Sequence, residues 1–299
     1  MKKIYFLIVF TLSFLRLSAQ QNLQYAKDSN SLLWEISGKN LKDTSYLFGT
    51  YHFVGQTFID TLPAIYKVFK QAKIIVGEMK MENEVLMAAQ LMPQMIMSGH
   101  KLDEILSPSE YQIVNNYLIK VSGGLHLNML NTLKPSAVLV TIMGFISPVK
   151  TAPGEKLIDI YFQQEGEKLK KKVIGLETIS EQARFLFGLP IKRQKEILLK
   201  TIKHADKQEQ HAKEVFKFYK TQDLENLRKA FGNYNHYTNK ELNVLMKNRN
   251  EIWMKKIPAV MEAGSSFIAV GGGHLIGKNG LINLLQKAGY NIRPINARI

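Results

Sequence analysis

The sequence predicts an α/β protein with a mostly parallel central sheet flanked by helices. Three apolar runs, at 45–49, 73–77 and 266–270, reach a glycine and lack the polar alternation of a half-exposed strand, which is typical of buried parallel strands. Between the first two runs, residues 58–72 carry apolar side chains at helical spacing. A strand, a helix and a strand within roughly thirty residues form a unit whose strands run parallel.

The start of the chain predicts one hairpin followed by this crossover. Residues 31–37 form a first strand, and a glycine turn leads to the second at 45–49, which places the first strand at an edge of the sheet. The helix at 58–72 has Pro63 in its first turn, where proline is tolerated. The following strand, 73–78, ends on a carboxylate.

Residues 81–150 are predicted to be a helical insertion into this sheet. Ser107 and Glu110 enclose a proline in a capping box, which predicts the start of a helix over 111–121. Pro135 begins a second apolar helix. Proline and glycine then mark the return of the chain to the core.

The second half of the chain repeats the alternation of helices and strands. Residues 157–167 have a helical pattern, and 171–177 form a strand that again ends on a carboxylate. A second helical insertion is predicted at about 190–260, with one long helix at 239–256 inside it. The last elements are strands at 266–270 and 290–295 around a helix at 281–288.

Composition describes an ordinary globular chain and excludes several functional classes. Of 299 residues, 45% are hydrophobic and 22% charged, and none is cysteine. The absence of cysteine excludes disulfides and a thiol nucleophile. The formal charge is +15, but the lysines are dispersed and accompany no helix-turn-helix, zinc finger or aromatic RNA-binding motif. We therefore expect no nucleic-acid partner.

Residues 1–19 have the pattern of a signal peptide, which leaves one domain at 20–299. Two lysines precede an apolar run at 4–15, and Ala19 supplies a small residue before the expected cleavage point. This run is too short for a transmembrane helix. We expect a periplasmic or secreted protein with no stable transmembrane span. Arg16 and its neighbour leucine fit a cleavage site imperfectly, so an uncleaved N-terminal anchor is the alternative.

Two histidines follow strand ends in matching contexts, Gly49-Thr-Tyr-His52 and Gly271-Gly-Gly-His274. Glu78 ends a third strand. Because ligands of open α/β sheets bind beyond the carboxyl ends of the strands, these three side chains are expected to meet there. Two imidazoles and one carboxylate are the protein ligands of an open catalytic metal site. The alternative is that each histidine is an ordinary hydrogen-bonded loop residue.

Seven motifs occur in the order found in the TraB/GumN family, which the chain resembles from about residue 31 to its C-terminus. They are Leu33-Trp34, Tyr46–His52, Glu78, Gly175-Leu-Glu177-Thr with Glu181-Gln182, Arg249-Asn250, Val270–Gly277 and Gly289-Tyr290. The family is related to the Tiki metalloproteases. The resemblance implies an EreA/ChaN-like fold with helical insertions, and a metal-dependent site of His52, Glu78 and His274. Gly272 stands where many members have alanine.

Further residues are candidates for the chemistry around such a site. Glu177 is a candidate general base or fourth metal ligand, because two carboxylates in one site can be driven to different pKa values. Arg249 could stabilise an oxyanion or bind a substrate carboxylate, and Asn250 could support it. The alternative for Glu177 and Arg249 is a structural buried ion pair.

Glycines beside the two histidines are candidates for a different role. Gly49, Gly271 and Gly273 could let the backbone approach a metal or substrate closely, or could simply form tight turns.

The sequence thus predicts an exported metal-dependent hydrolase, peptidase-like, that uses Mn²⁺, Co²⁺ or Zn²⁺ on a peptide or small-molecule substrate. One alternative is a non-catalytic protein of the same fold that binds a peptide or small ligand. The other is a metal-independent esterase with a histidine base, which the wider resemblance to erythromycin esterase-like enzymes suggests.

Overall fold

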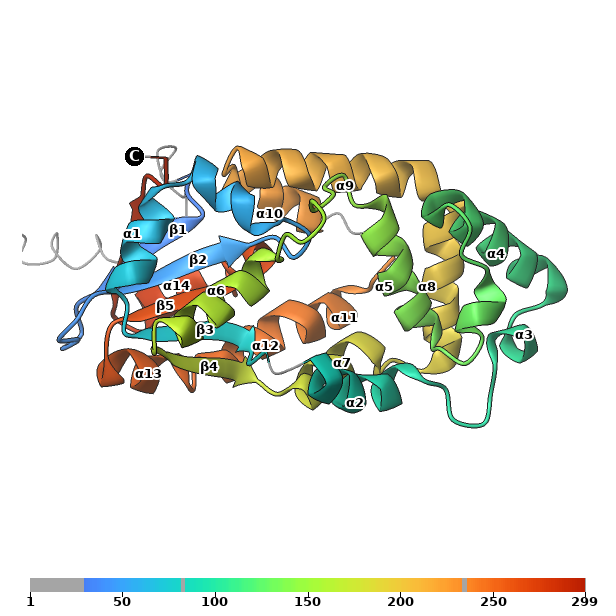
Figure 1. Cartoon of the computed structure of the whole chain (residues 1–299), viewed down its shortest axis with the longest axis horizontal. Coiled ribbons are helices and arrows are strands. Elements are labelled where there is room, and N and C mark those ends of the chain that lie inside the picture. Colours follow the sequence, from blue (N-terminus) through green and yellow to red (C-terminus); the bar gives the residue numbers. More distant parts are fainter. Residues whose placement is uncertain (1–29, 82–83, 233–235, 299) are drawn as a thin grey trace, which may run out of the picture.

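A computed structural model describes residues 30–81, 84–232 and 236–298, and it confirms the α/β class (Figure 1). Six strands form a single sheet in the order β4-β3-β5-β2-β1-β6. Their bounds are β1 Leu33–Ser37, β2 Ser45–Thr50, β3 Ile74–Met79, β4 Lys172–Glu177, β5 Ser266–Gly271 and β6 Asn291–Ile295. The pairs β2–β5, β5–β3 and β3–β4 are parallel, and β1 is antiparallel to both of its neighbours.

The predicted hairpin forms, but its first strand does not lie at the sheet edge. Leu33 of β1 pairs with Phe48 of β2 on one side and with Ile295 of β6 on the other. The C-terminal strand therefore covers β1 and becomes the edge itself. The edge prediction was wrong because the distant C-terminal strand takes up the remaining backbone groups of β1.

An aromatic cluster holds two helices against one face of the sheet. The ring centroid of Phe162 in α6 (Ile158–Lys168) lies 5.8 Å from that of Phe48 in β2 and 4.8 Å from that of Phe267 in β5. Its ring also lies 5.4 Å from Phe69 of α1 (Ala64–Gln71). Burial of rings of this size supplies much of the energy of a core.

The predicted helix at 58–72 is interrupted. Residues Gln56–Thr61 form a 3₁₀ helix, η1, and α1 begins only after Pro63. Leu62, which precedes the proline, has φ −136° and ψ 64°. Proline disfavours helical angles in the residue before it, which explains the break.

Residues 81–150, where the first helical insertion was predicted, contain five helices in their described part. They are α2 Glu84–Met95, α3 Leu102–Ile105, α4 Pro108–Ser122, the 3₁₀ helix η2 Leu127–Leu130 and α5 Pro135–Ile146. Ser107 caps α4 in the predicted box: its hydroxyl accepts from the Glu110 amide and its own amide donates to the Glu110 carboxylate.

The second insertion is broken into more helices than its pattern suggested. After α7 (Ile179–Phe187), which precedes the insertion, come α8 Ile191–Lys203, α9 Ala205–Lys220, α10 Leu224–Gly232, α11 Asn239–Asn243 and α12 Arg249–Trp253. A π-helical turn, Val244–Asn248, interrupts the helix predicted at 239–256 immediately before Arg249. The remaining helices, α13 Ile257–Ala263, the 3₁₀ helix η4 Gly272–His274 and α14 Leu281–Lys287, flank β5.

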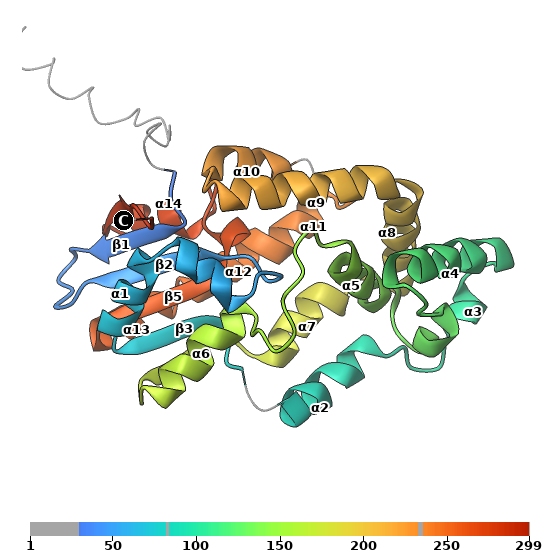
Figure 2. The same ribbon diagram turned by 45° about the horizontal axis from the view of Figure 1, so that its top comes forward.

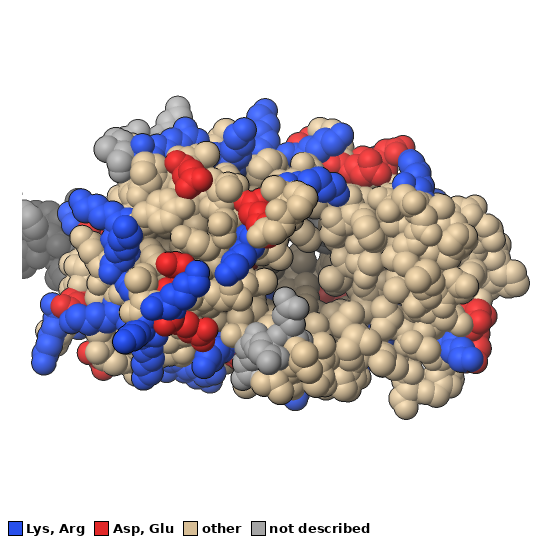
Figure 3. Space-filling view, viewed as in Figure 1, with Lys and Arg blue, Asp and Glu red and all other residues tan. Residues whose placement is uncertain are grey.

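The two insertions pack together beyond the carboxyl end of the sheet (Figure 2). Leu118 of α4, Ile142 of α5 and Leu198 of α8 share one buried apolar cluster that is separate from the core around the sheet. Figure 3 shows the surface hollowed between the sheet half and this helical half. The sheet edge that carries the candidate residues therefore faces a second, helical core.

The predicted signal peptide, 1–19, lies outside the described residues. Across 30–81, 84–232 and 236–298, no helix combines the length and the apolar character that crossing a membrane requires.

Candidate functional site

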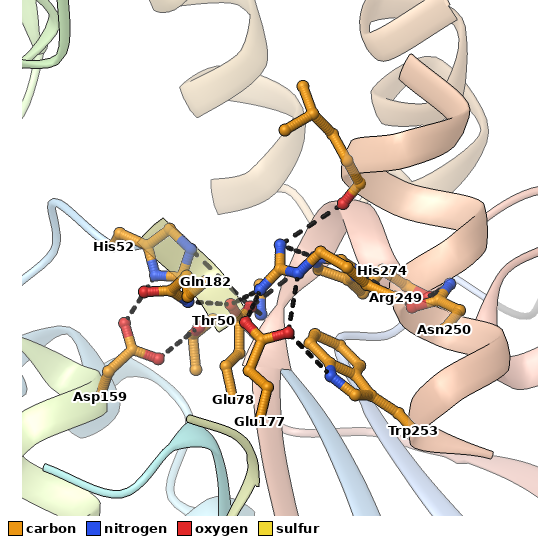
Figure 4. A network of polar contacts seen from close by, with 12 residues as sticks. Thr50, His52, Glu78, Asp159, Glu177, Gln182, Arg249, Asn250, Trp253 and His274 are labelled. Carbon is orange, nitrogen blue, oxygen red and sulfur yellow. Dashed lines mark hydrogen bonds and ion pairs between the residues drawn. The ribbon is translucent and has the colours of Figure 1, made fainter. Parts of the chain in front are cut away.

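The three predicted metal ligands meet at the carboxyl ends of β2, β3 and β5 (Figure 4). Parallel pairing of Thr50 with Gly271 aligns the exits of the first and last of these strands. Glu78 Oε1 lies 3.9 Å from Nε2 of His52 and 3.8 Å from Nε2 of His274. One carboxylate oxygen thus stands between two imidazole nitrogens that come from opposite ends of the chain.

His52 is oriented by a residue that the sequence did not single out. Its Nδ1 lies 2.9 Å from Oδ2 of Asp159, and the Thr50 hydroxyl donates to Oδ1 of the same carboxylate at 2.7 Å. Because a carboxylate only accepts, Nδ1 carries the hydrogen. Nε2 is therefore the nitrogen on the side of Glu78, and it has a free lone pair whenever the imidazole is neutral.

His274 is held in the same tautomer by Asn250. The Asn250 amide nitrogen donates to the carbonyls of His274 and Asn279, at 3.0 and 2.8 Å. Its amide oxygen is thereby turned to His274 Nδ1, 2.7 Å away. Asn250, which was predicted to support Arg249, thus contacts His274 through both ends of its amide.

Glu78 is buried but surrounded by donors. The Gly271 amide donates to its Oε1 at 2.8 Å, and Arg249 Nη2 and Gln182 Nε2 donate to its Oε2 at 2.6 and 3.1 Å. Burial favours the neutral acid, but nearby histidine and arginine charges and the Gly271 amide outweigh it and lower the pKa to about 2. The site therefore contains a carboxylate at neutral pH.

Arg249 and Glu177 form a buried ion pair behind this carboxylate. Arg249 Nε and Nη2 donate to the two oxygens of Glu177, and Trp253 Nε1 donates to Glu177 Oε2 at 3.1 Å. The Glu177 side chain is only 2% exposed. Its oxygens face the arginine, and it does not line the cavity.

Every N–H of Arg249 has an acceptor. Besides the carboxylates of Glu177 and Glu78, Nη1 is directed to Nε2 of His274 at 3.0 Å and to the carbonyl of Leu245 at 3.4 Å. A guanidinium has five N–H donors, and all are used here. In this arrangement Arg249 has none left for a substrate oxyanion or carboxylate.

The two imidazoles have opposite electrostatic environments. Burial, together with the Arg249 and His52 charges, lowers the pKa of His274 to about 3 against the attraction of Glu78. For His52, loss of hydration acts in the same direction, but Asp159 and Glu78 outweigh it and raise the pKa to about 9. The His52 side chain is 57% exposed, so solvent screening weakens this increase. His274 is neutral at pH 7, as a metal ligand must be.

Of the three candidate glycines, Gly271 faces the site directly. A Cβ on Gly271 would lie 3.1 Å from His52 Nε2 and 3.2 Å from Glu78 Oε1. A Cβ on Gly49 would instead meet Leu275, and one on Gly273 the ring of Phe231. Gly271 keeps open the space between His52 Nε2 and Glu78 Oε1, whereas Gly49 and Gly273 allow close packing against Leu275 and Phe231.

The donors suit a divalent cation in chemistry and orientation. Both imidazoles are tied at Nδ1, the second-shell arrangement typical of metal-bound histidine, and both direct Nε2 toward Glu78. Among the described residues, however, no three His, Asp or Glu side chains are already grouped as a metal site. Arg249 Nη1 already donates a hydrogen bond to Nε2 of His274, the nitrogen that would bind the metal. Metal binding at these three residues therefore requires Arg249 to release His274.

A cavity of about 300 Å³ adjoins His52 and Glu78. Residues of β3, α6 and α7 line it, including Gln163 and Leu186. Volumes of this order are found at the lower end of ligand pockets.

Acidification is expected to destabilise the fold through His274 and Glu78. The pKa of His274 falls from 6.5 to about 3 on folding, so the unfolded chain binds the proton first and stability is lost as the pH falls through this window. Glu78, lowered from 4.5 to about 2, adds a loss below pH 4.5. Denaturant unfolding at a series of pH values should show the stability gap between wild type and Glu78→Gln closing from pH 4.5 downward. A gap that stays constant to pH 3 would contradict this assignment.

Two site residues lacked a usable sequence signal. Asp159 lies in the first turn of α6, where an acidic residue is ordinary helix chemistry. Thr50 reads simply as the last residue of a strand. Only the packing of α6 against the strand exits brings both to His52.

Comparisons with known proteins agree with the predicted relationship. "Metalloprotease TIKI1" of Xenopus tropicalis is 24% identical over 95% of this chain and 68% of its own length. "Metalloprotease TIKI2" of Danio rerio is 22% identical over 89% and 61%, and "Metalloprotease TIKI1" of Homo sapiens is 23% identical over 89% and 63%. The chain thus spans roughly two thirds of these relatives. No solved structure matches it significantly.

The match to a family description covers nearly all of the described chain. The TraB/PrgY/gumN family matches residues 32–294, which include the exits of β2, β3 and β5 and both insertions. The chain therefore belongs to the TraB/PrgY/gumN family.

Proposed function

We propose that this protein is a metal-dependent hydrolase that cleaves peptides. The observation that carries the proposal is the convergence of two Nε2 atoms, each fixed by a partner at Nδ1, on one oxygen of Glu78. Relatives named as metalloproteases support the same reaction class.

In this proposal His52, Glu78 and His274 hold the cation, which would be Mn²⁺, Co²⁺ or Zn²⁺. A bound divalent cation supplies Lewis-acid polarisation of a substrate carbonyl. Asp159 and Asn250 fix the two imidazoles, and Arg249 holds Glu78 ionised in a buried position. The adjoining cavity receives the substrate.

Calorimetric titration with each of the three metals tests the site. Wild type should bind one equivalent, and the double variant His52→Ala/His274→Ala should bind none. The double variant His100→Ala/His126→Ala is a matched control, because these histidines are exposed and do not line the cavity. Absence of binding by folded wild type would refute the metal site.

One observation favours a second candidate, a metal-independent esterase. His52 is paired with Asp159 as a general base is paired with the group that orients it, while Arg249 occupies His274 Nε2. This candidate requires ester hydrolysis that survives a chelator and disappears in His52→Ala. Hydrolysis that is abolished by the chelator and restored by metal would exclude it.

Replacing Asp159 by asparagine is expected to lower metal affinity about 10–100-fold, the usual effect of losing a second-shell partner. The variant keeps the side-chain shape but removes the charge that fixes the His52 tautomer. Calorimetry and the visible spectrum of the Co²⁺-loaded protein measure the effect. Asp103→Asn on α3 serves as control, and equal affinity in the two variants would contradict the role of Asp159.

We further infer that the protein is exported, with cleavage near Ala19. The inference rests on the lysines and the apolar run at 4–15. N-terminal sequencing of the protein recovered from the periplasm or medium tests it. An intact Met1 on a membrane-bound protein would instead support the uncleaved anchor.

A further inference from the structure

We propose that the cavity beside His52 is a subsite for one large, unbranched or γ-branched apolar side chain of the substrate, adjacent to the bond that is cut. Leucine, methionine and phenylalanine are the side chains of this class. The inference rests on the proposed peptidase function and adds to it a substrate class.

Both polar and apolar side chains line the cavity. His52, Asp159 and Glu78 form one polar group, in which His52 lies 2.9 Å from Asp159 and 3.9 Å from Glu78. The apolar walls include side chains of the β3 exit, α6 and α7, namely Met79, Met81, Leu157, Ile160 and Leu186. A substrate whose scissile carbonyl lies at the polar group can place a neighbouring side chain against these walls.

The polar side chains of the walls already have partners within the protein. Gln163 Nε2 donates to the carbonyl of Met79 at 3.0 Å, and its Oε1 accepts from the amide of Met81 at 2.8 Å. Gln182 donates to Glu78, and all donors of Arg249 are used. Within 30–81, 84–232 and 236–298, no lysine lines the cavity. A charged substrate side chain that lies against these walls, and not against His52, Glu78 or Asp159, would therefore lose its hydration without gaining a partner.

An apolar side chain gains free energy in proportion to the area that it removes from water. Leu186 is 38% exposed and Met81 is partly buried, so both still expose apolar surface that a ligand can cover. The volume of about 300 Å³ leaves an alanine side chain with few contacts. Size and polarity of the cavity thus select against small and charged side chains together.

Cleavage of a randomised peptide library by the metal-loaded full chain tests the substrate class. At one position beside the cut, leucine, methionine or phenylalanine should be preferred over lysine, glutamate and alanine by about ten-fold or more in kcat/KM. Leu186→Lys should shift the preference at that position toward aspartate and glutamate. Ile113→Lys is the matched control, because Ile113 is 52% exposed on α4 and does not line the cavity. Cleavage without a preference, or an unchanged preference in Leu186→Lys, would overturn the proposal.

Binding to the metal-free chain separates this inference from the peptidase proposal. N-acetyl-leucinamide should bind, as followed by NMR shifts, and N-acetyl-lysinamide should not; Leu186→Lys should abolish binding of the former. If this holds while no peptide is cut with any of the three metals, the subsite stands and the peptidase function fails. If N-acetyl-leucinamide binds no better than N-acetyl-lysinamide, the subsite is refuted even where peptides are cut.

Discussion

Replacing Arg249 by methionine is expected to lower the free energy of unfolding by about 3–5 kcal/mol, the usual effect of removing one partner of a buried ion pair. The guanidinium lies between Glu78 and Glu177, whose side chains are 8% and 2% exposed. Without it, two carboxylates remain buried without their cation and repel each other. Urea or guanidinium unfolding at pH 7 measures the loss.

Arg293→Met provides the matched control for this prediction. Arg293 also pairs with a carboxylate, that of Glu35, but its side chain is 72% exposed. Exposed ion pairs contribute only about 0–1 kcal/mol to stability, so the free energy of unfolding of this variant should remain close to that of wild type. If the two methionine variants lost equal stability, the ion pairs of Arg249 with Glu78 and Glu177 would contribute no more to the free energy of unfolding than an exposed pair does.

Replacing Gly271 by alanine is expected to reduce the proposed metal affinity and peptide hydrolysis by about 100-fold, as displacements of the order of 1 Å in a site do. The new Cβ would lie 3.1 Å from His52 Nε2 and 3.2 Å from Glu78 Oε1. These contacts are tighter than carbon normally makes, so both donors must move apart. The fold itself should persist, since the crowding falls on side-chain ends and not on backbone.

Gly272→Ala tests the same change one residue later. The nearest atom to its new Cβ would be the carbonyl oxygen of Thr50 at 3.4 Å, with Leu227 and Tyr219 side chains at 3.7 Å. These are ordinary contacts. Metal affinity and stability within about 0.5 kcal/mol of wild type are expected. Equal effects of the two alanines would mean that the space beside Gly271 is not part of the site.

The strands and the convergence of three residues were predictable because they depend on local pattern and on one topological rule. Parallel strands present their carboxyl ends on the same side, so His52, Glu78 and His274 had to share an edge once their strands were recognised. Local chemistry likewise predicted the cap of α4, since Ser107 needs only a neighbour three residues away. The antiparallel pairing of β1 with β6 was missed, because its partners lie more than 250 residues apart along the chain.

By itself, the sequence determined the α/β class, the order of the strands along the chain and the sheet edge at which the candidate ligands meet. Only the tertiary structure decided what each of those side chains contacts. Asp159 reaches His52 from a helix with no motif, and Arg249 is fully engaged by two carboxylates, a histidine and a carbonyl. The physical reason is that periodicity reports which face of an element is buried, whereas hydrogen-bond partners depend on how separate elements pack against one another.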